Sequence, residues 1–122
     1  MTKVNYLEIL KRNSELGDSL TTQPYNIHVL SNIVVNQLKE FLEYTLRLKR
    51  INANVTFGNY DNIVQDSQNL KDVDSIIIFW ELSNLFNGFH YNIELYKEKK
   101  IKDILEKTKI EIDFVIENLE TI

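Results

Sequence analysis

The sequence predicts an α/β fold with a short parallel sheet, and three observations carry that prediction. Strand-like and helix-like segments alternate along the 122 residues. Residues 75–80, Ser-Ile-Ile-Ile-Phe-Trp, form an unbroken apolar run, which is typical of a strand covered on both faces by helices. The chain also has only three glycines and one proline, which are too few for a turn-rich all-β fold.

A helix, a loop and a strand are expected in the first 30 residues. Apolar residues among charges predict an amphipathic helix over residues 4–16. Residues 17–24 are polar and end in proline, so they predict a loop. The run Tyr-Asn-Ile-His-Val-Leu at 25–30 predicts the first strand.

A second helix is expected over residues 33–50 and a second strand over 54–57. The inward positions of this helix recur at helical spacing, at Val34, Leu38, Phe41, Leu42, Thr45 and Leu48. Cations occupy its last turn, where they suit the negative end of the helix dipole. Residues 59–72 are polar and allow either a loop or a short helix.

After the strand at 75–80 and a linker rich in asparagine and glycine, a long helix is expected over 91–122. Its main stripe consists of Ile101, Ile104, Leu105, Thr108, Ile112, Val115, Ile116 and Leu119. Ile110 and Phe114 lie on the opposite side. Because a helix that is apolar on two sides packs between two partners, we expect further strands after residue 122 or a second copy of the chain here. Two scattered surface residues are the alternative.

Strands alternating with helices predict a three-layer architecture with the sheet order 2-1-3 of flavodoxin-like folds. Ligands of such folds bind beyond the carboxyl ends of the strands, between strands one and three. Three strands make a narrow sheet for this architecture. We therefore expect one domain, or the N-terminal fragment of one, with a helix and loop (1–24), a β-α-β-β core (25–90) and a long helix (91–122).

Composition narrows the possible functions. A formal net charge of −4 argues against a nucleic-acid-binding surface. No apolar stretch approaches the roughly 20 residues that span a bilayer. The N-terminus lacks the apolar run of a signal peptide, so a cytoplasmic location is expected. With no cysteine, the chain has neither disulfide nor thiolate chemistry.

No metal or cofactor site is predicted. The aspartates, Asp61, Asp66, Asp72 and Asp74, are too scattered for a recognisable metal site, and no glycine-rich phosphate loop is present. A basic run at the start of the long helix consists of Lys97, Lys99, Lys100 and Lys102. A solvated helix face is the expected interpretation, and docking of an acidic partner is the alternative.

The tetrapeptide Gly17-Asp18-Ser19-Leu20 spells the signature of the GDSL esterases. In that family it directly follows the first buried strand, so that the turn presents the serine. Here it lies at a helix end and precedes the first strand. Ser19 is therefore interpreted as a loop or helix-cap residue rather than as a nucleophile.

Polar residues at three strand ends form a better candidate site. Ser31 and Asn32 end the first strand, next to the start of a helix whose N–H groups can stabilise an anion. Gly58 ends the second strand and Asn84 follows the third. The layout resembles that of SGNH-type hydrolases, with Ser31 at the nucleophile position and Gly58 and Asn84 at oxyanion-hole positions. The alternative is structural, because serine and asparagine cap helices and glycine allows turns.

A nucleophilic serine also needs a base. The SGNH layout supplies an aspartate and a histidine after the last strand, and this sequence ends too early to contain them. His28 lies inside the first strand and is interpreted as a core or sheet-face residue. His90 lies among aromatic residues before the long helix and is a candidate for lining the mouth of the crevice. The chain alone is thus expected to lack a complete catalytic set.

The segment from Ile27 to Gly58 resembles the N-terminal region of FkbH-like proteins. The residues that carry the resemblance are Ile27-His28-Val29-Leu30-Ser31-Asn32, Gln37-Leu38-Lys39, Leu42-Glu43-Tyr44 and Val55-Thr56-Phe57-Gly58-Asn59-Tyr60. A looser resemblance extends over residues 20–122.

This resemblance implies a place in a larger enzyme. FkbH-like proteins join an SGNH-like region to a phosphatase-like domain of the haloacid dehalogenase superfamily, whose opening Asp-x-Asp motif is absent here. Members dephosphorylate a glyceryl phosphate and load a three-carbon unit onto acyl carrier protein in polyketide and related pathways. The chain would then be the non-catalytic N-terminal portion, which positions the carrier protein or a glyceryl-type substrate for the downstream domain.

Two other functions stay open at this point. A small SGNH-like esterase or acyltransferase would use Ser31 as its nucleophile. A flavodoxin-like binding or signalling module is permitted by the 2-1-3 sheet order. The first strand, however, is not followed by the acidic pair with which a receiver domain binds magnesium.

Overall fold

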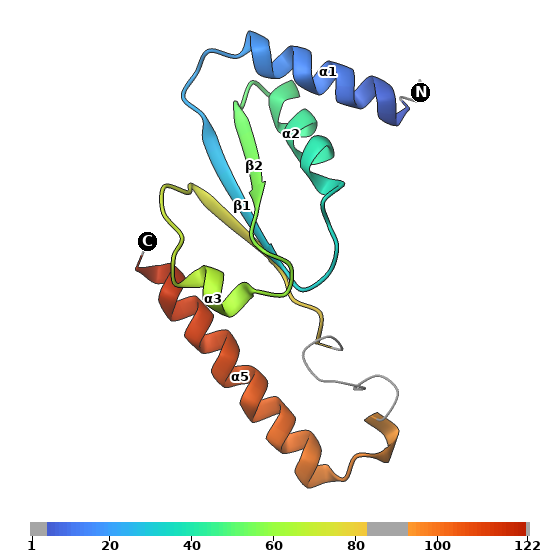
Figure 1. Ribbon diagram of the computed structural model, residues 1–122, viewed down its shortest axis with the longest axis vertical. Coiled ribbons are helices and arrows are strands. Elements are labelled where there is room, and N and C mark those ends of the chain that lie inside the picture. The colour runs from blue at the N-terminus through green and yellow to red at the C-terminus, as the bar shows by residue number, and fades with distance from the viewer. Residues whose placement is uncertain (1–4, 83–92, 122) are drawn as a thin grey trace. The chain divides into compact units, whose positions relative to one another are not determined.

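The computed structural model describes residues 5–82 and 93–121, in which helices alternate with parallel strands (Figure 1). In chain order the elements are α1 (Tyr6–Ser19), β1 (Tyr25–Ser31), α2 (Leu38–Leu48), β2 (Ala53–Phe57), α3 (Ile63–Ser67), β3 (Ser75–Phe79), the 3-10 helix η2 (Ile93–Leu95) and α5 (Glu98–Glu120). The described strands form a parallel sheet in the order β2-β1-β3. The predicted α/β class and sheet order are confirmed.

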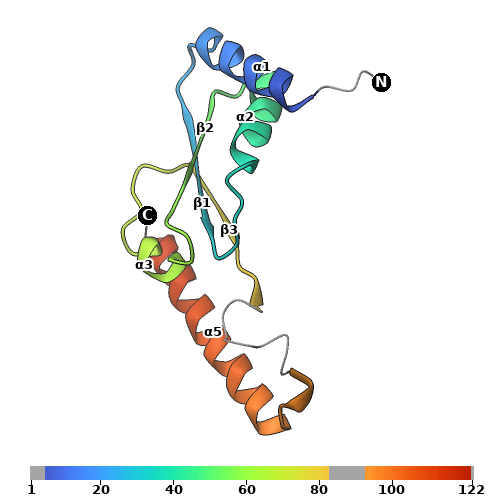
Figure 2. The ribbon, with the colours of Figure 1, turned by 45° about the vertical axis from the view of Figure 1, so that its right-hand side comes forward.

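The central strand β1 runs beside β2 (Figure 2) and pairs with it in parallel. The register places Tyr25 opposite Ala53 and Val29 opposite Phe57. Along β2 the first four residues alternate between buried and exposed, with Ala53 and Val55 buried. Because successive side chains of a strand point to opposite faces, one face of β2 is covered and the other is open.

The chain divides into two compact units. The first comprises Met1–Val29, Val35–Phe57 and Val73–Ile77, and the second comprises Leu30–Val34, Gly58–Asp72 and Ile78–Ile122. Of the described elements, α1, α2 and β2 belong to the first unit, and α3, η2 and α5 belong to the second. Both β1 and β3 contribute residues to each unit.

Helix boundaries differ from the predicted ones. The first helix continues through Ser19, so residues 17–19 form its last turn rather than the start of a loop. Its N-terminus is capped by Asn5, whose side chain accepts a hydrogen bond from the amide of Glu8 at 2.8 Å. The second helix begins at Leu38 instead of residue 33. The helix expected over 91–122 is not continuous: in the described residues, η2 and α5 are separated by Tyr96 and Lys97, which are not helical.

The described core is small, and three expected burial patterns were wrong. Buried apolar residues are Ile27, Val29, Leu30, Ala53, Val55, Ile63, Ile104 and Val115. All five residues of β3 are only half-buried, although an unbroken apolar run predicts a strand covered on both faces. In α5 the main stripe is only partly buried, because Leu105, Ile112 and Ile116 are exposed. In the second helical segment, the stripe residues Val34, Phe41, Thr45 and Leu48 are exposed.

The buried residue of α2 is a glutamate. Glu43 is 3% exposed, and its carboxylate accepts hydrogen bonds from Lys39 Nζ at 2.8 Å and from the Val55 amide at 2.9 Å. Asn13 of α1 donates a third bond through Nδ2 at 3.2 Å. The carboxylate thus joins α1, α2 and β2 within the first unit, because a buried charge must be paired and hydrogen-bonded.

Arg47 extends this polar cluster. Its Nη1 donates to the main-chain and side-chain oxygens of Asn13, both at 3.0 Å, and its Nη2 donates to Ala53 O at 3.0 Å. Burial by itself raises the pKa of Glu43. The hydrogen bonds from Lys39, the Val55 amide and Asn13 outweigh burial and hold the pKa of this carboxyl below its ordinary value. Glu43 therefore stays ionised inside the first unit.

Candidate functional site

Ser31, the expected nucleophile position, ends β1 as predicted and is buried, with 7% of its surface exposed. Its hydroxyl donates to Ile33 O at 2.7 Å and accepts from the Ile33 amide at 2.9 Å. Both bonds join a serine to the residue two positions later, which is the geometry of a local side-chain turn. The hydroxyl proton is thus directed at a main-chain carbonyl.

Asn32 acts as a clamp within the second unit. Its Nδ2 donates to Glu81 O at 2.8 Å, and its Oδ1 accepts from the Glu81 amide at 2.7 Å. The Asn32 amide also donates to Phe79 O at 3.1 Å. The carboxamide therefore substitutes for a peptide group and continues the pairing beyond the end of β3. Since Asn32 is buried, these bonds satisfy groups that would otherwise be costly to leave unpaired.

Gly58 directly follows β2, as predicted, and two side chains approach it closely. A Cβ at this position would lie 2.6 Å from Asp66 Oδ2 and 2.8 Å from Leu30 Cδ2. The Asp66 carboxylate accepts a hydrogen bond from the Asn59 amide at 2.8 Å and another from Asn62 Nδ2 at 2.9 Å. Glycine thus allows the loop after β2 to approach this carboxylate closely.

The same loop is bonded to the end of β1. The amide of Asp61 donates to Ser31 O at 3.0 Å, and Asp61 adopts a φ of 52°, in the left-handed region. Aspartate tolerates this region better than most residues. Ser31, Asn32, Gly58, Asp61 and Asp66 therefore form one connected edge at the carboxyl ends of the strands, which we call the strand-end rim.

Asp61 and Asp66 are the rim residues that sequence reasoning did not identify, because the four aspartates of this region are too scattered along the chain for a recognisable metal site. The signal for Asp66 is local: Asn62 and Asp66 are four residues apart, so a short helix starting near Asn62 brings their side chains together close to Gly58. Among the described residues, no group of three or more histidine, cysteine, aspartate or glutamate side chains could hold a metal ion.

Two further candidates, Asn84 and His90, lie outside the described residues. The other histidine, His28, faces Thr56 across the β1–β2 pair, and its Nδ1 lies 2.7 Å from Thr56 Oγ1. This is the contact of a sheet-face histidine, as expected.

Ser19 and the Gly-Asp-Ser-Leu tetrapeptide end α1. The Ser19 hydroxyl donates to Leu16 O at 3.0 Å, one turn earlier in the helix. A Cβ on Gly17 would lie 2.8 Å from Nη1 of Arg47, so this glycine allows the arginine to approach α1. The tetrapeptide thus has a structural role at a helix end.

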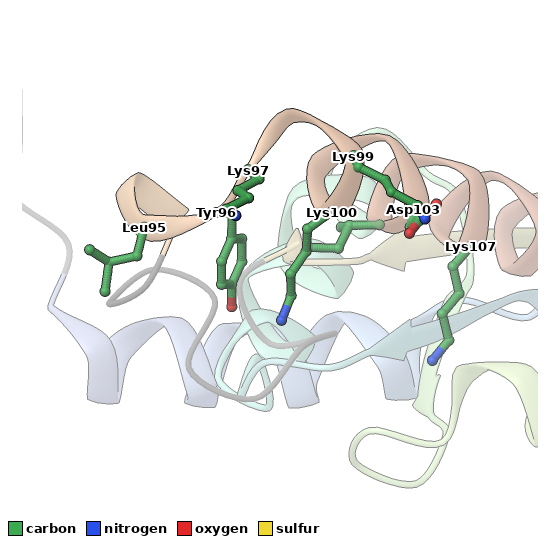
Figure 3. A pocket seen from close by; sticks show the side chains of 8 residues that line it. Leu95, Tyr96, Lys97, Lys99, Lys100, Asp103 and Lys107 are labelled. Carbon is green, nitrogen blue, oxygen red and sulfur yellow. The ribbon is translucent and has the colours of Figure 1, made fainter.

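A hollow surface away from the strand-end rim lies at the start of α5 (Figure 3). It has a volume of about 770 Å³, and its lining residues are Leu95, Tyr96, Lys97, Lys99, Lys100, Asp103, Ile104 and Lys107. Figure 3 shows Tyr96, Lys100 and Lys107 directed to the same side of the helix. The Lys100 ammonium lies 4.6 Å from the centre of the Tyr96 ring, a cation–π contact. We call this surface the lysine groove.

Comparisons with known proteins do not assign this chain to a family. A scan against models of protein families and searches of curated proteins and solved structures found no match for this chain. Within the part of the chain that the structure describes, no helix is both long enough and apolar enough to cross a membrane.

Proposed function

We propose that this chain is a non-catalytic, SGNH-like accessory domain of an FkbH-like enzyme. In this proposal, the strand-end rim positions an acyl carrier protein, or the glyceryl-type group that it carries, for a phosphatase-like domain. The resemblance of residues 27–58 to the FkbH N-terminal region motivates the proposal. The parallel 2-1-3 sheet supports it, because ligands of such sheets bind at the carboxyl ends of the strands.

The hydrogen bonding of the Ser31 hydroxyl is the observation that favours a positioning role over catalysis. An activated serine donates its proton to a base that removes it during attack. Here the hydroxyl of Ser31 is bonded to the main chain of Ile33 as donor and as acceptor. The neighbouring Asn32 is likewise engaged with the main chain of Glu81. These hydrogen bonds hold both side chains against the main chain, as a positioning role requires.

The first test separates this proposal from an esterase that uses Ser31. The chain is treated with a fluorophosphonate probe and assayed with p-nitrophenyl acetate, next to the variants Ser31→Ala and Ser19→Ala. We expect no probe on Ser31 and equal background hydrolysis by all three proteins. Labelling that Ser31→Ala abolishes and Ser19→Ala retains would establish the esterase instead.

The second test concerns the partner. An isotope-labelled chain is titrated with an acyl carrier protein of a polyketide pathway, in the apo form and loaded with a glyceryl group. We expect amide shifts of residues 31–33 and 58–62 to move most with the loaded form. Exposed Asn59 offers a variant, Asn59→Arg, that we expect to weaken binding, while Thr45→Arg on α2 serves as the control. Unchanged spectra with both forms would contradict the proposal.

A further inference from the structure

The charges of α5 are divided between its two halves. Residues 97–109 contain six lysines and three acidic residues, whereas residues 110–120 contain four acidic residues and no base. This distribution opposes the helix dipole, because the N-terminal end of a helix favours negative charge and the C-terminal end favours positive charge. The cap position is occupied by Lys97, which makes no capping hydrogen bond through its side chain. Opposite charges from outside α5, placed along each half, would offset this unfavourable interaction with the dipole.

One face of α5 carries a regular stripe across both halves. Its members are three and four residues apart, at Lys100, Asp103, Lys107, Ile110, Phe114 and Glu117. Positions with this spacing lie on one side of a helix and form the seam of a coiled coil. The lysine groove occupies the first half of the stripe. In the second half, Ile110 is 69% exposed and Phe114 is 40% exposed.

We propose that a second copy of this chain covers that stripe, with the two α5 helices antiparallel. Pairing position 100 with the partner's 117, 103 with 114 and 107 with 110 brings the two halves of the stripe together. Lys100 then meets an acidic residue, Glu117. Phe114 enters the partner's lysine groove beside Ile104, and Ile110 packs on the aliphatic stem of Lys107. Each contact occurs twice, as a two-fold interface requires.

Charge complementarity selects this occupant and this direction. In the antiparallel pair, each basic half lies along an acidic half, which also offsets the unfavourable interaction of each half with its own helix dipole. A parallel pair would align lysines with lysines and carboxylates with carboxylates, which is destabilising. The pairing does not depend on the proposed function, because it uses α5 and the segment just before it rather than the strand-end rim.

The first measurement is the mass of the chain in solution by sedimentation equilibrium, from low to high protein concentration and at low and high salt. We expect a dimer that high salt weakens, because the contacts between the halves are charged. Phe114→Asp is expected to raise the dissociation constant about tenfold or more. The matched control is Leu105→Asp, which introduces the same charge on another exposed face of α5. It is expected to leave the dimer intact.

A charge-reversal pair tests the direction and the partner. One variant replaces Lys97, Lys100 and Lys107 by glutamate, and the other replaces Glu111, Glu117 and Glu120 by lysine. Each alone has two halves of like charge and is expected to be monomeric, while an equal mixture is expected to form a heterodimer. Circular dichroism verifies that each variant keeps its helices. A monomeric wild-type chain, or a dimer broken by Leu105→Asp but not by Phe114→Asp, would overturn the inference.

Discussion

Glu43 shows how one charged residue can organise a packed unit. Its carboxylate receives hydrogen bonds from a side chain of α1, a side chain of α2 and a main-chain amide of β2. Lys39 also donates to Val55 O at 2.7 Å, so the ammonium is shared between the carboxylate and the strand. Buried charges are tolerated when they are paired and hydrogen-bonded in this way.

Replacing this carboxylate by its neutral isostere should destabilise the first unit strongly. In Glu43→Gln, Lys39 and Arg47 lose the negative charge that they face, and the new amide group directs a donor at other donors. We expect the free energy of unfolding to fall by about 3 kcal/mol. Urea denaturation followed by circular dichroism measures it. Glu106→Gln, an exposed position on α5, is the control and should change stability by less than about 0.5 kcal/mol. Equal stability of both variants would contradict this role.

The same carboxylate predicts a dependence of stability on pH. The pKa of Glu43 in the folded chain is lowered from the ordinary value of 4.5. Its contribution is therefore fully present above pH 4.5 and is lost as the pH falls through the lower folded-state pKa. The stability difference between the wild type and Glu43→Gln should shrink in that acidic window. A difference that stays constant from neutral pH to pH 3 would show that the charge is not the cause.

At the scale of elements, periodicity predicted which segments are helices and strands but not which side chains they bury. All three strands and the long helix were found near their expected positions, because alternation and apolar runs reflect local geometry. The stripe expected for α2 failed because a hydropathy pattern counts glutamate as exposed. It takes no account of the donors that Asn13 and the Val55 amide bring from distant positions in the sequence.

The strand-end rim was also predictable only in part, because local patterns predict where strands end but not which distant groups meet there. Ser31 and Gly58 were located from strand ends alone, since parallel strands end at a common edge. The roles of Asn32 and Asp66 depend on main-chain groups at Glu81 and Asn59. Those partners follow from loop conformation, which no residue pattern in the sequence specifies.

Asn32 is the rim residue whose side chain must both donate and accept a hydrogen bond with the main chain of Glu81. In Asn32→Asp the side chain can still accept from the Glu81 amide, but it places a carboxylate oxygen against Glu81 O where Nδ2 now donates. We expect a loss of about 1–3 kcal/mol in the free energy of unfolding. Thermal denaturation measures it, and Asn59→Ala, at an exposed position in the adjacent loop, is the control. A stability unchanged within error would mean that the clamp is not formed in solution.

At the scale of the whole molecule, the chain contains two compact units that are stabilised differently. The first unit contains the buried polar cluster around Glu43, and the second contains the strand-end rim and α5. Hydrogen exchange reports the free energy with which each segment opens, so it can distinguish one cooperative unit from two.

The two destabilising variants should therefore change exchange in different segments. In Glu43→Gln, we expect amides of α1, α2 and β2 to exchange faster, because their shared carboxylate is lost. In Asn32→Asp, the increase should be concentrated in α3, α5 and the residues that follow β3. Mass spectrometry of peptides after deuterium labelling measures both patterns under native conditions. A uniform increase along the chain in both variants would mean that the protein opens as one cooperative unit, as most small domains do.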